Sequence, residues 1–141
     1  MSSHLIQVHG ACHCGAVRFE AEVNPKHVTA CHCTDCQVMS GAPYRAVAPA
    51  RSDRFRLLAG EPAEYVKTAD SGNRRISSFC SVCGTHLWGT DEGPSPRAYG
   101  LRVGALAERD QLVPQVQIWC QSALNWTEDL SGIKKWDRTP E

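Results

Sequence analysis

The chain has 141 residues and a mass of 15.5 kDa, which is the size of one domain. Lys plus Arg and Asp plus Glu each total 15, so the net charge is zero. This balance excludes the strongly basic surface by which proteins bind nucleic acid or anionic membranes. We therefore expect a single domain over residues 1–141, with a frayed tail at 137–141 and neither a nucleic-acid nor a membrane partner.

Short strands dominate the expected secondary structure. Residues 17–23 alternate apolar and polar side chains with a period of two, which is typical of a half-buried strand. Weaker strand segments follow in chain order at 44–48, 55–58, 64–67, 75–79, 85–89, 99–103 and 115–119. Helical turns are expected at 34–40, with Thr34 as N-cap, and at 106–111. A Gly/Pro-rich loop is expected at 91–96, and the whole pattern indicates a mainly β, antiparallel domain.

Cysteine is the outstanding feature of the composition, with eight residues against two methionines. The first ten residues lack the apolar block of a signal peptide, so we expect a cytoplasmic protein. Thiols in the cytosol stay reduced, and metal binding or catalysis is then the expected role of the cysteines. Seven of the eight fall in three clusters: Cys12 and Cys14; Cys31, Cys33 and Cys36; and Cys80 and Cys83.

Two of these clusters form pairs whose spacing suits tetrahedral zinc. Cys80 and Cys83 are three residues apart, and a tight turn followed by glycine brings such sulfurs together. Cys12 and Cys14 are two residues apart, so on an extended strand both would project to one face and reach one ion. Two pairs give the four ligands of a closed structural site.

The third cluster leaves three sulfurs. Cys33 and Cys36 are spaced for one helical turn, and Cys31 adds a sulfur from the preceding extended residue. Three protein ligands with one further position are typical of catalytic zinc. The spacing also permits other partitions, including a second closed site completed by one of three histidines: His13, His32 or His86. An iron–sulfur cluster is disfavoured because the spacing matches neither ferredoxin pattern.

The remaining candidates have simpler interpretations. His13 and His32 each lie inside a Cys-x-Cys and, on a strand, would point away from the flanking sulfurs. Cys120 lies beside Trp119 in an expected apolar strand and is predicted to be a core residue. Three arginines are placed to offset thiolate charge, although each is also typical of a solvated strand edge: Arg45, Arg74 and Arg75.

Together these motifs carry a family resemblance. The runs Cys12-His-Cys14-Gly15, Cys31-His-Cys33-Thr-Asp-Cys36, Ser40-Gly41-Ala42 and Phe79-Cys80-Ser-Val-Cys83-Gly84 closely resemble the glutathione-dependent formaldehyde-activating enzyme family. That family also includes centromere protein V. The resemblance implies a zinc-stapled β-tent fold of stacked antiparallel sheets. It also implies two zinc ions per chain, a structural one on Cys12, Cys14, Cys80 and Cys83 and a catalytic one on Cys31, Cys33 and Cys36.

The activity that the resemblance implies is that of a carbon–sulfur lyase, which joins glutathione and formaldehyde to give S-(hydroxymethyl)glutathione. Glutathione, or another small thiol, is then the expected partner. The terminal strand departs from the family pattern, because Gln117 and Ala123 stand where a histidine and a basic residue are common. The alternative is a zinc-stabilised binding module with two structural zincs, whose candidate surface residues are Trp88, Trp119, Trp126 and Trp136.

Overall fold

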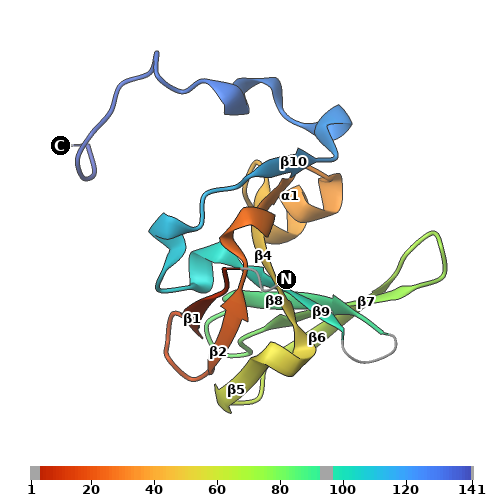
Figure 1. Cartoon of the computed structure of the whole chain (residues 1–141). Helices are drawn as coiled ribbons and strands as arrows, with labels where there is room; N and C mark the ends of the chain where they lie inside the picture. Colours follow the sequence, from red (N-terminus) through yellow and green to blue (C-terminus); the bar gives the residue numbers. More distant parts are fainter. Residues whose placement is uncertain (1–3, 93–96, 141) are drawn as a thin grey trace.

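The computed structural model describes residues 4–92 and 97–140, which form ten strands and one α-helix (Figure 1). The strands are β1 (Ile6–Ala11), β2 (Arg18–Val23), β3 (Thr29–Cys31), β4 (Arg45–Arg51), β5 (Phe55–Ala59), β6 (Ala63–Thr68), β7 (Arg74–Phe79), β8 (His86–Asp91), β9 (Ala98–Arg102) and β10 (Val116–Ile118). The helix is α1 (Thr34–Ser40). The expected mainly β fold is confirmed, and each of the eight expected strands overlaps an observed one. Residues 93–96 of the expected loop lie outside the described residues.

The strands form two sheets. The smaller has the order β1-β2-β5, and the larger has the order β10-β3-β4-β9-β8-β7-β6. Neighbouring strands are antiparallel as expected, except that β10 pairs in parallel with β3. A parallel pair needs a long return connection. Residues 103–115 carry the chain from β9 to this edge of the sheet, with two 3-10 turns, Val103–Ala105 and Arg109–Gln111. Only the second turn falls inside the expected helical segment 106–111.

The core lies between the two sheets. Alternate residues of β2 are buried, so Phe19, Ala21 and Val23 pack towards the larger sheet. Phe19 lies directly against β1, where a Cβ on Gly10 would come within 2.1 Å of its ring. The larger sheet contributes alternate residues in return, including Ala48, Ala50, Leu87 and Leu101. The two stacked sheets therefore share one apolar cluster.

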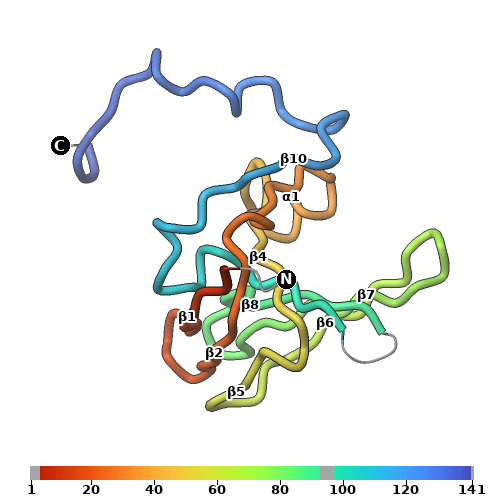
Figure 2. The backbone as a smooth tube through the Cα atoms, in the orientation of Figure 1, coloured from red at the N-terminus to blue at the C-terminus, as the bar shows by residue number. Residues whose placement is uncertain are grey.

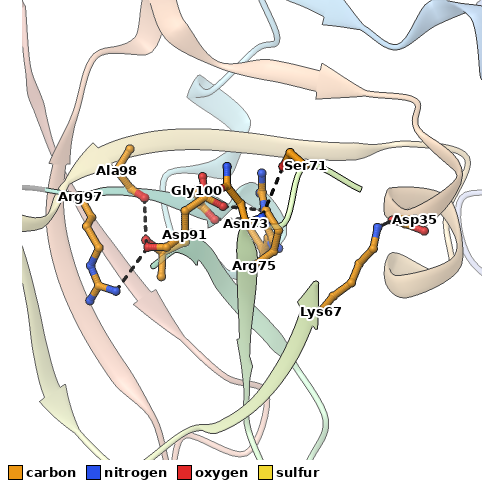
Figure 3. A network of polar contacts seen from close by, with 11 residues as sticks. Asp35, Lys67, Ser71, Asn73, Arg75, Asp91, Arg97, Ala98 and Gly100 are labelled. Carbon is orange, nitrogen blue, oxygen red and sulfur yellow. Dashed lines mark hydrogen bonds and ion pairs between the residues drawn. The ribbon is translucent and has the colours of Figure 1, made fainter. Parts of the chain in front are cut away.

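The opposite face of the larger sheet carries polar side chains. Register places Arg45 opposite Cys31 and Arg102 opposite Val47, so the period of two directs all four residues away from the core. Helix α1 lies at this end of the sheet, and Lys67 of β6 reaches it through an ion pair with Asp35 (Figure 3). Because β6 and β3 are far apart in the strand order, this contact means that the sheet curls round towards the helix.

Beyond β10 the chain leaves the sheets and runs to the C-terminus as short 3-10 turns and irregular segments (Figure 2). The chain changes direction at Trp119, which has a left-handed φ of 57°. The Trp119 side chain is 56% exposed. The prediction that Cys120 is a core residue is wrong, because this turn places it in an exposed 3-10 segment instead of an apolar strand. Within the described residues, none of the helical segments has the length and apolar character needed to cross a membrane.

Candidate metal centres

Four sulfurs meet where the β1–β2 turn approaches the β7–β8 turn. The Sγ atoms of Cys12, Cys14, Cys80 and Cys83 all lie within 4.8 Å of one another. Cys14 Sγ is 3.6 Å from Cys12 Sγ and 3.7 Å from Cys80 Sγ. Tetrahedral zinc with Zn–S bonds of about 2.3 Å places its sulfurs roughly 3.8 Å apart. The group therefore has the dimensions that a zinc tetrathiolate requires, and the two pairs expected to meet do so.

Tight turns, not an extended strand, present these sulfurs. Cys12 and Cys14 follow β1 in the turn that leads to β2, so their expected placement on a strand is wrong. The Gly15 amide donates to the Cys12 carbonyl at 3.0 Å, and the Gly84 amide donates to the Cys80 carbonyl at 2.9 Å. Gly15 and Gly84 have φ values of 83° and 78°, a region that other residues rarely adopt. The glycine after each pair thus has the role that the sequence predicted.

Hydrogen bonds to sulfur favour thiolate at this site. The Val17 amide donates to Cys12 Sγ at 3.2 Å. The Thr85 hydroxyl lies 3.2 Å from Cys83 Sγ. This hydroxyl, followed by the backbone amides of Thr85 and Cys14, lowers the pKa of the Cys83 thiol to about 5. Cys83 is therefore ionised at neutral pH and ready to bind a cation.

Neighbouring sulfurs oppose the ionisation of Cys14. The Ala16 amide lowers the pKa of Cys14, but the sulfur of Cys12, burial and the sulfurs of Cys80 and Cys83 together raise it to about 11. One thiolate therefore suppresses ionisation of its neighbour by repulsion. A divalent metal removes this penalty because it favours the deprotonated form of every ligand.

Three further sulfurs meet at the start of α1. The Sγ atoms of Cys31, Cys33 and Cys36 lie within 4.8 Å of one another. Cys31 ends β3, and Cys33 is the N-cap of the helix, where its sulfur accepts a hydrogen bond from the Cys36 amide at 3.3 Å. The prediction that Thr34 caps the helix is therefore wrong, because the cysteine sulfur takes that position.

Among the described residues, neither sulfur group includes a histidine. His13 is exposed, as expected of a residue between two ligands. His32 is buried, and its Nε2 lies 2.8 Å from Gln117 Oε1. Gln37 of α1 donates from its side-chain amide to the carbonyls of His32 and Ser122 at 2.9 and 3.0 Å. These bonds fasten the three-cysteine group to the segment around β10.

Arginines flank the three-cysteine group as the charge argument predicted, but they are not all the expected ones. Arg74 and Arg75 are exposed and pair with Glu92 and Asp91, as solvated strand-edge residues do. Arg45 lies closer to the sulfurs. Burial and the Cys33 sulfur raise the pKa of Cys36 to about 12, while the charge of Arg45 opposes this rise.

Sequence reasoning missed Arg102. It ends β9, it is buried, and its charge in turn lowers the pKa of His86, after burial and Arg45. The sequence shows only an arginine near the end of the expected strand 99–103. An arginine in that position is also typical of an ordinary strand end, so it did not indicate a functional residue.

Comparison with known proteins covers most of the chain. A model of the glutathione-dependent formaldehyde-activating enzyme family matches residues 7–122. The fold is also similar to a crystal structure of a Rhodobacter sphaeroides protein, with a TM-score of 0.61 and 25% sequence identity. That alignment covers 77% of this chain and 98% of the other. The family match includes both sulfur groups and ends at residue 122, near the start of the exposed C-terminal segment.

Proposed function

The chain belongs to the glutathione-dependent formaldehyde-activating enzyme family, and on this premise we propose that it is a zinc-dependent enzyme of the carbon–sulfur lyase type. It adds a thiol such as glutathione to formaldehyde or a related small electrophile. The observation that carries the proposal is the separation of seven sulfurs into a group of four and a group of three.

The two groups have different proposed roles. Cys12, Cys14, Cys80 and Cys83 complete a tetrahedral set, which suits a structural zinc that joins two distant turns. The remaining three sulfurs, from Cys31, Cys33 and Cys36, suit a catalytic zinc.

The proposed role of the three-cysteine group is to activate a substrate thiol. A zinc ion on these sulfurs would supply one more ligand position, at which a substrate thiol loses its proton. In the overall addition, the sulfur–carbon bond forms, the C=O π bond breaks and the thiol proton is transferred to the oxygen. The Cys36 amide stabilises the Cys33 thiolate, and the bond between His32 and Gln117 holds the Cys31–Cys33 loop in place.

The residues around the groups support the wider proposal. All eight cysteines are free thiols, and such thiols persist in a reducing compartment, which favours the cytoplasm. One apolar cluster is shared by both sheets, which favours one domain over residues 1–141. The exposure of residues 131–140 supports the proposed frayed tail at 137–141.

A second candidate is a non-catalytic binding module with two structural zincs. Exposed tryptophans in the C-terminal segment favour it, because Trp119, Trp126 and Trp136 are each about half exposed or more. Trp88, in contrast, is buried against Phe19 and Phe55 and belongs to the core.

Metal exchange separates the two candidates. We expect elemental analysis to give two zinc ions per chain, of which one exchanges with added isotope and responds to glutathione. Turnover of glutathione with formaldehyde, followed by NMR of the product, then tests the enzyme directly. Two inert zincs and no product would instead support the binding module.

A further inference from the structure

Two arginines beside the three-cysteine group, the buried Arg102 and the half-buried Arg45, lack an acidic partner among the described residues. Arg102 is 8% exposed, and its Nε is buried without a hydrogen-bond partner. Its guanidinium makes one hydrogen bond, from Nη1 to the Gly100 carbonyl at 3.2 Å. Arg45 Nη2 is likewise buried and unpartnered. Over residues 4–92 and 97–140, neither arginine forms an ion pair, although burying a charge without compensation is costly.

The fold builds a place for the Arg102 guanidinium. β8 and β9 pair with Gly89 opposite Gly100, which leaves a strip of sheet without side chains. A Cβ on Gly89 would come within 2.6 Å of Arg102 Nη2, and one on Gly100 would lie 3.5 Å from Nη1. The guanidinium therefore lies over the two glycines, on the same face of the sheet as Arg45 and Cys31.

The positive charges act directly on the sulfurs. Arg45 opposes the rise in the pKa of Cys36, and the sulfurs of Cys36 and Cys31 oppose the fall in the pKa of Arg102. Burial, followed by repulsion from Arg45, lowers the pKa of Arg102 to about 9, so it stays cationic at neutral pH. Burial, Arg45 and Arg102 together lower the pKa of His86, which is therefore neutral there and adds no charge.

The acidic residues Asp91 and Asp35 already form ion pairs with other basic residues. Asp91 pairs with Arg75 at 3.0 Å, and Asp35 pairs with Lys67 (Figure 3). Zinc with three thiolates carries a formal charge of about −1, while the two arginines contribute about +2. A substrate thiolate on the metal would balance the remaining positive charge. The buried donors Arg102 Nε and Arg45 Nη2 still call for an acceptor from outside the chain.

We propose that Arg45 and Arg102 bind a substrate carboxylate beside the three-cysteine group. This assignment rests on the proposed function and narrows it to small reactants that carry a carboxylate close to the reacting thiol or aldehyde. A guanidinium holds a carboxylate through two parallel N–H···O bonds, which a neutral reactant such as formaldehyde cannot accept. The carboxylate can belong to the thiol or to the aldehyde, and the two sources are separable by experiment.

Matched probes test the site by calorimetry on the zinc-loaded protein. If the thiol carries the carboxylate, we expect mercaptoacetate to bind at least about tenfold more tightly than 2-mercaptoethanol. If the aldehyde carries it, we expect thiol addition to glyoxylate to be at least about tenfold faster than addition to formaldehyde. A preference among thiols assigns the carboxylate to the thiol, and a preference among aldehydes assigns it to the aldehyde. Equal behaviour within both probe pairs overturns the proposal.

Variants then assign the preference to the two arginines. Arg45→Gln and Arg102→Lys should each remove the preference for the probe that carries a carboxylate. Lysine keeps the positive charge at position 102 but lacks the two parallel N–H donors of a guanidinium. Arg74→Gln is the control, since Arg74 is exposed and pairs with Glu92. An advantage that survives both arginine variants, with folding verified by circular dichroism, contradicts the assignment. Product formation without any carboxylate preference overturns this site alone. Carboxylate binding without any product overturns the proposed activity and leaves the site standing.

Discussion

Gln117 Oε1 lies 2.8 Å from Nε2 of the buried His32, and this bond joins β10 to the Cys31–Cys33 loop. With the amide oxygen as acceptor, Nε2 carries the imidazole proton. The His32 amide also donates to the Ile118 carbonyl at 3.0 Å. Gln117 therefore positions the loop that carries two of the three sulfurs.

Gln117→Ala should loosen the three-cysteine group. The variant leaves the buried Nε2 of His32 without its partner, at a cost of about 1–3 kcal/mol in unfolding free energy. Because residues behind metal ligands tune affinity, we expect zinc to bind the three-cysteine group about 10- to 100-fold more weakly. Competition with a chromogenic chelator measures this affinity. Gln115→Ala is the control, because that side chain is exposed and, within the described part of the chain, donates only to the Val113 carbonyl. Equal zinc affinity in the two variants would show that the bond to His32 does not support the group.

Cys80→Ser should abolish cooperative folding. Structural zinc contributes roughly 10–16 kcal/mol of apparent binding free energy, which is comparable with the whole stability of a small domain. Thermal unfolding by circular dichroism and zinc content by mass spectrometry should fall together. Cys120→Ser, at an exposed cysteine outside both groups, should change neither. A folded Cys80→Ser protein with two zinc ions would contradict the structural role.

Cys33→Ser should separate activity from folding. The hydroxyl can still cap α1 by accepting from the Cys36 amide, so the helix start is preserved. The thiolate ligand is lost, and we expect turnover of glutathione with formaldehyde to drop below detection. The zinc content should fall to one ion per chain, while the melting temperature changes by a few degrees only. Unchanged turnover in this variant would contradict the catalytic role of the three-cysteine group.

Gly84→Ala should destabilise the protein through backbone strain. Gly84 has a φ of 78°, where an L-residue costs about 1–2 kcal/mol, although a Cβ there meets nothing within 4 Å. Gly104→Ala is a matched control, because its surroundings are equally open and its φ lies outside the left-handed range. Chemical denaturation of the two variants measures the difference. Equal midpoints would mean that the turn after Cys83 relaxes without penalty.

His9 and Glu108 should make stability depend on pH. His9 Nδ1 is 2.7 Å from Glu108 Oε2, and this bond raises the pKa of the histidine. Burial raises the pKa of Glu108, but hydrogen bonds from the His9 side chain and amide outweigh it, so the pKa of Glu108 is lowered overall. The histidine contribution is complete below its ordinary pKa of 6.5 and is lost as pH rises through the raised value. The glutamate contribution is present above its ordinary pKa of 4.5 and is lost as pH falls through the lowered value.

The contribution of this pair is therefore largest at roughly pH 5–6.5. We expect the urea midpoint of the native protein, relative to His9→Gln, to peak in that window and to decline on both sides. His27→Gln replaces an exposed histidine elsewhere and serves as the control. A midpoint difference that is flat with pH would show that the pair does not titrate with folding.

Much of the fold was predictable because its strands alternate. The pattern from 17 to 23 predicted β2, which lies at the centre of the smaller sheet with alternate residues buried. β1 was missed because Gly10 interrupts its apolar face, and the reason for that glycine is the ring of Phe19 on the neighbouring strand. β3 is three residues long, too short for a period to be visible, and is defined by its partners β4 and β10.

The sulfur groups were predictable for a different reason: their members are close in sequence or fall in recognisable pairs. Side chains that approach through the tertiary fold were not. Arg102 comes beside Cys31 and Cys36 only through the β3-β4-β9 order, which no local pattern encodes. The burial of Cys120 was predicted wrongly because the turn at Trp119, with its φ of 57°, ends β10 earlier than the apolar run suggests.

The two sulfur groups differ in how soon the chain can complete them during synthesis. The three-cysteine group spans six residues, from Cys31 to Cys36, and closing so short a loop costs little entropy. The four-cysteine group must wait until Cys83 has left the ribosome and can return to Cys12. A nascent chain can therefore capture its first metal ion at the local group, before either sheet is complete. The distant pairs can close only later, and their metal can then join the turn after β1 to the turn after β7 before β9 and β10 have left the ribosome.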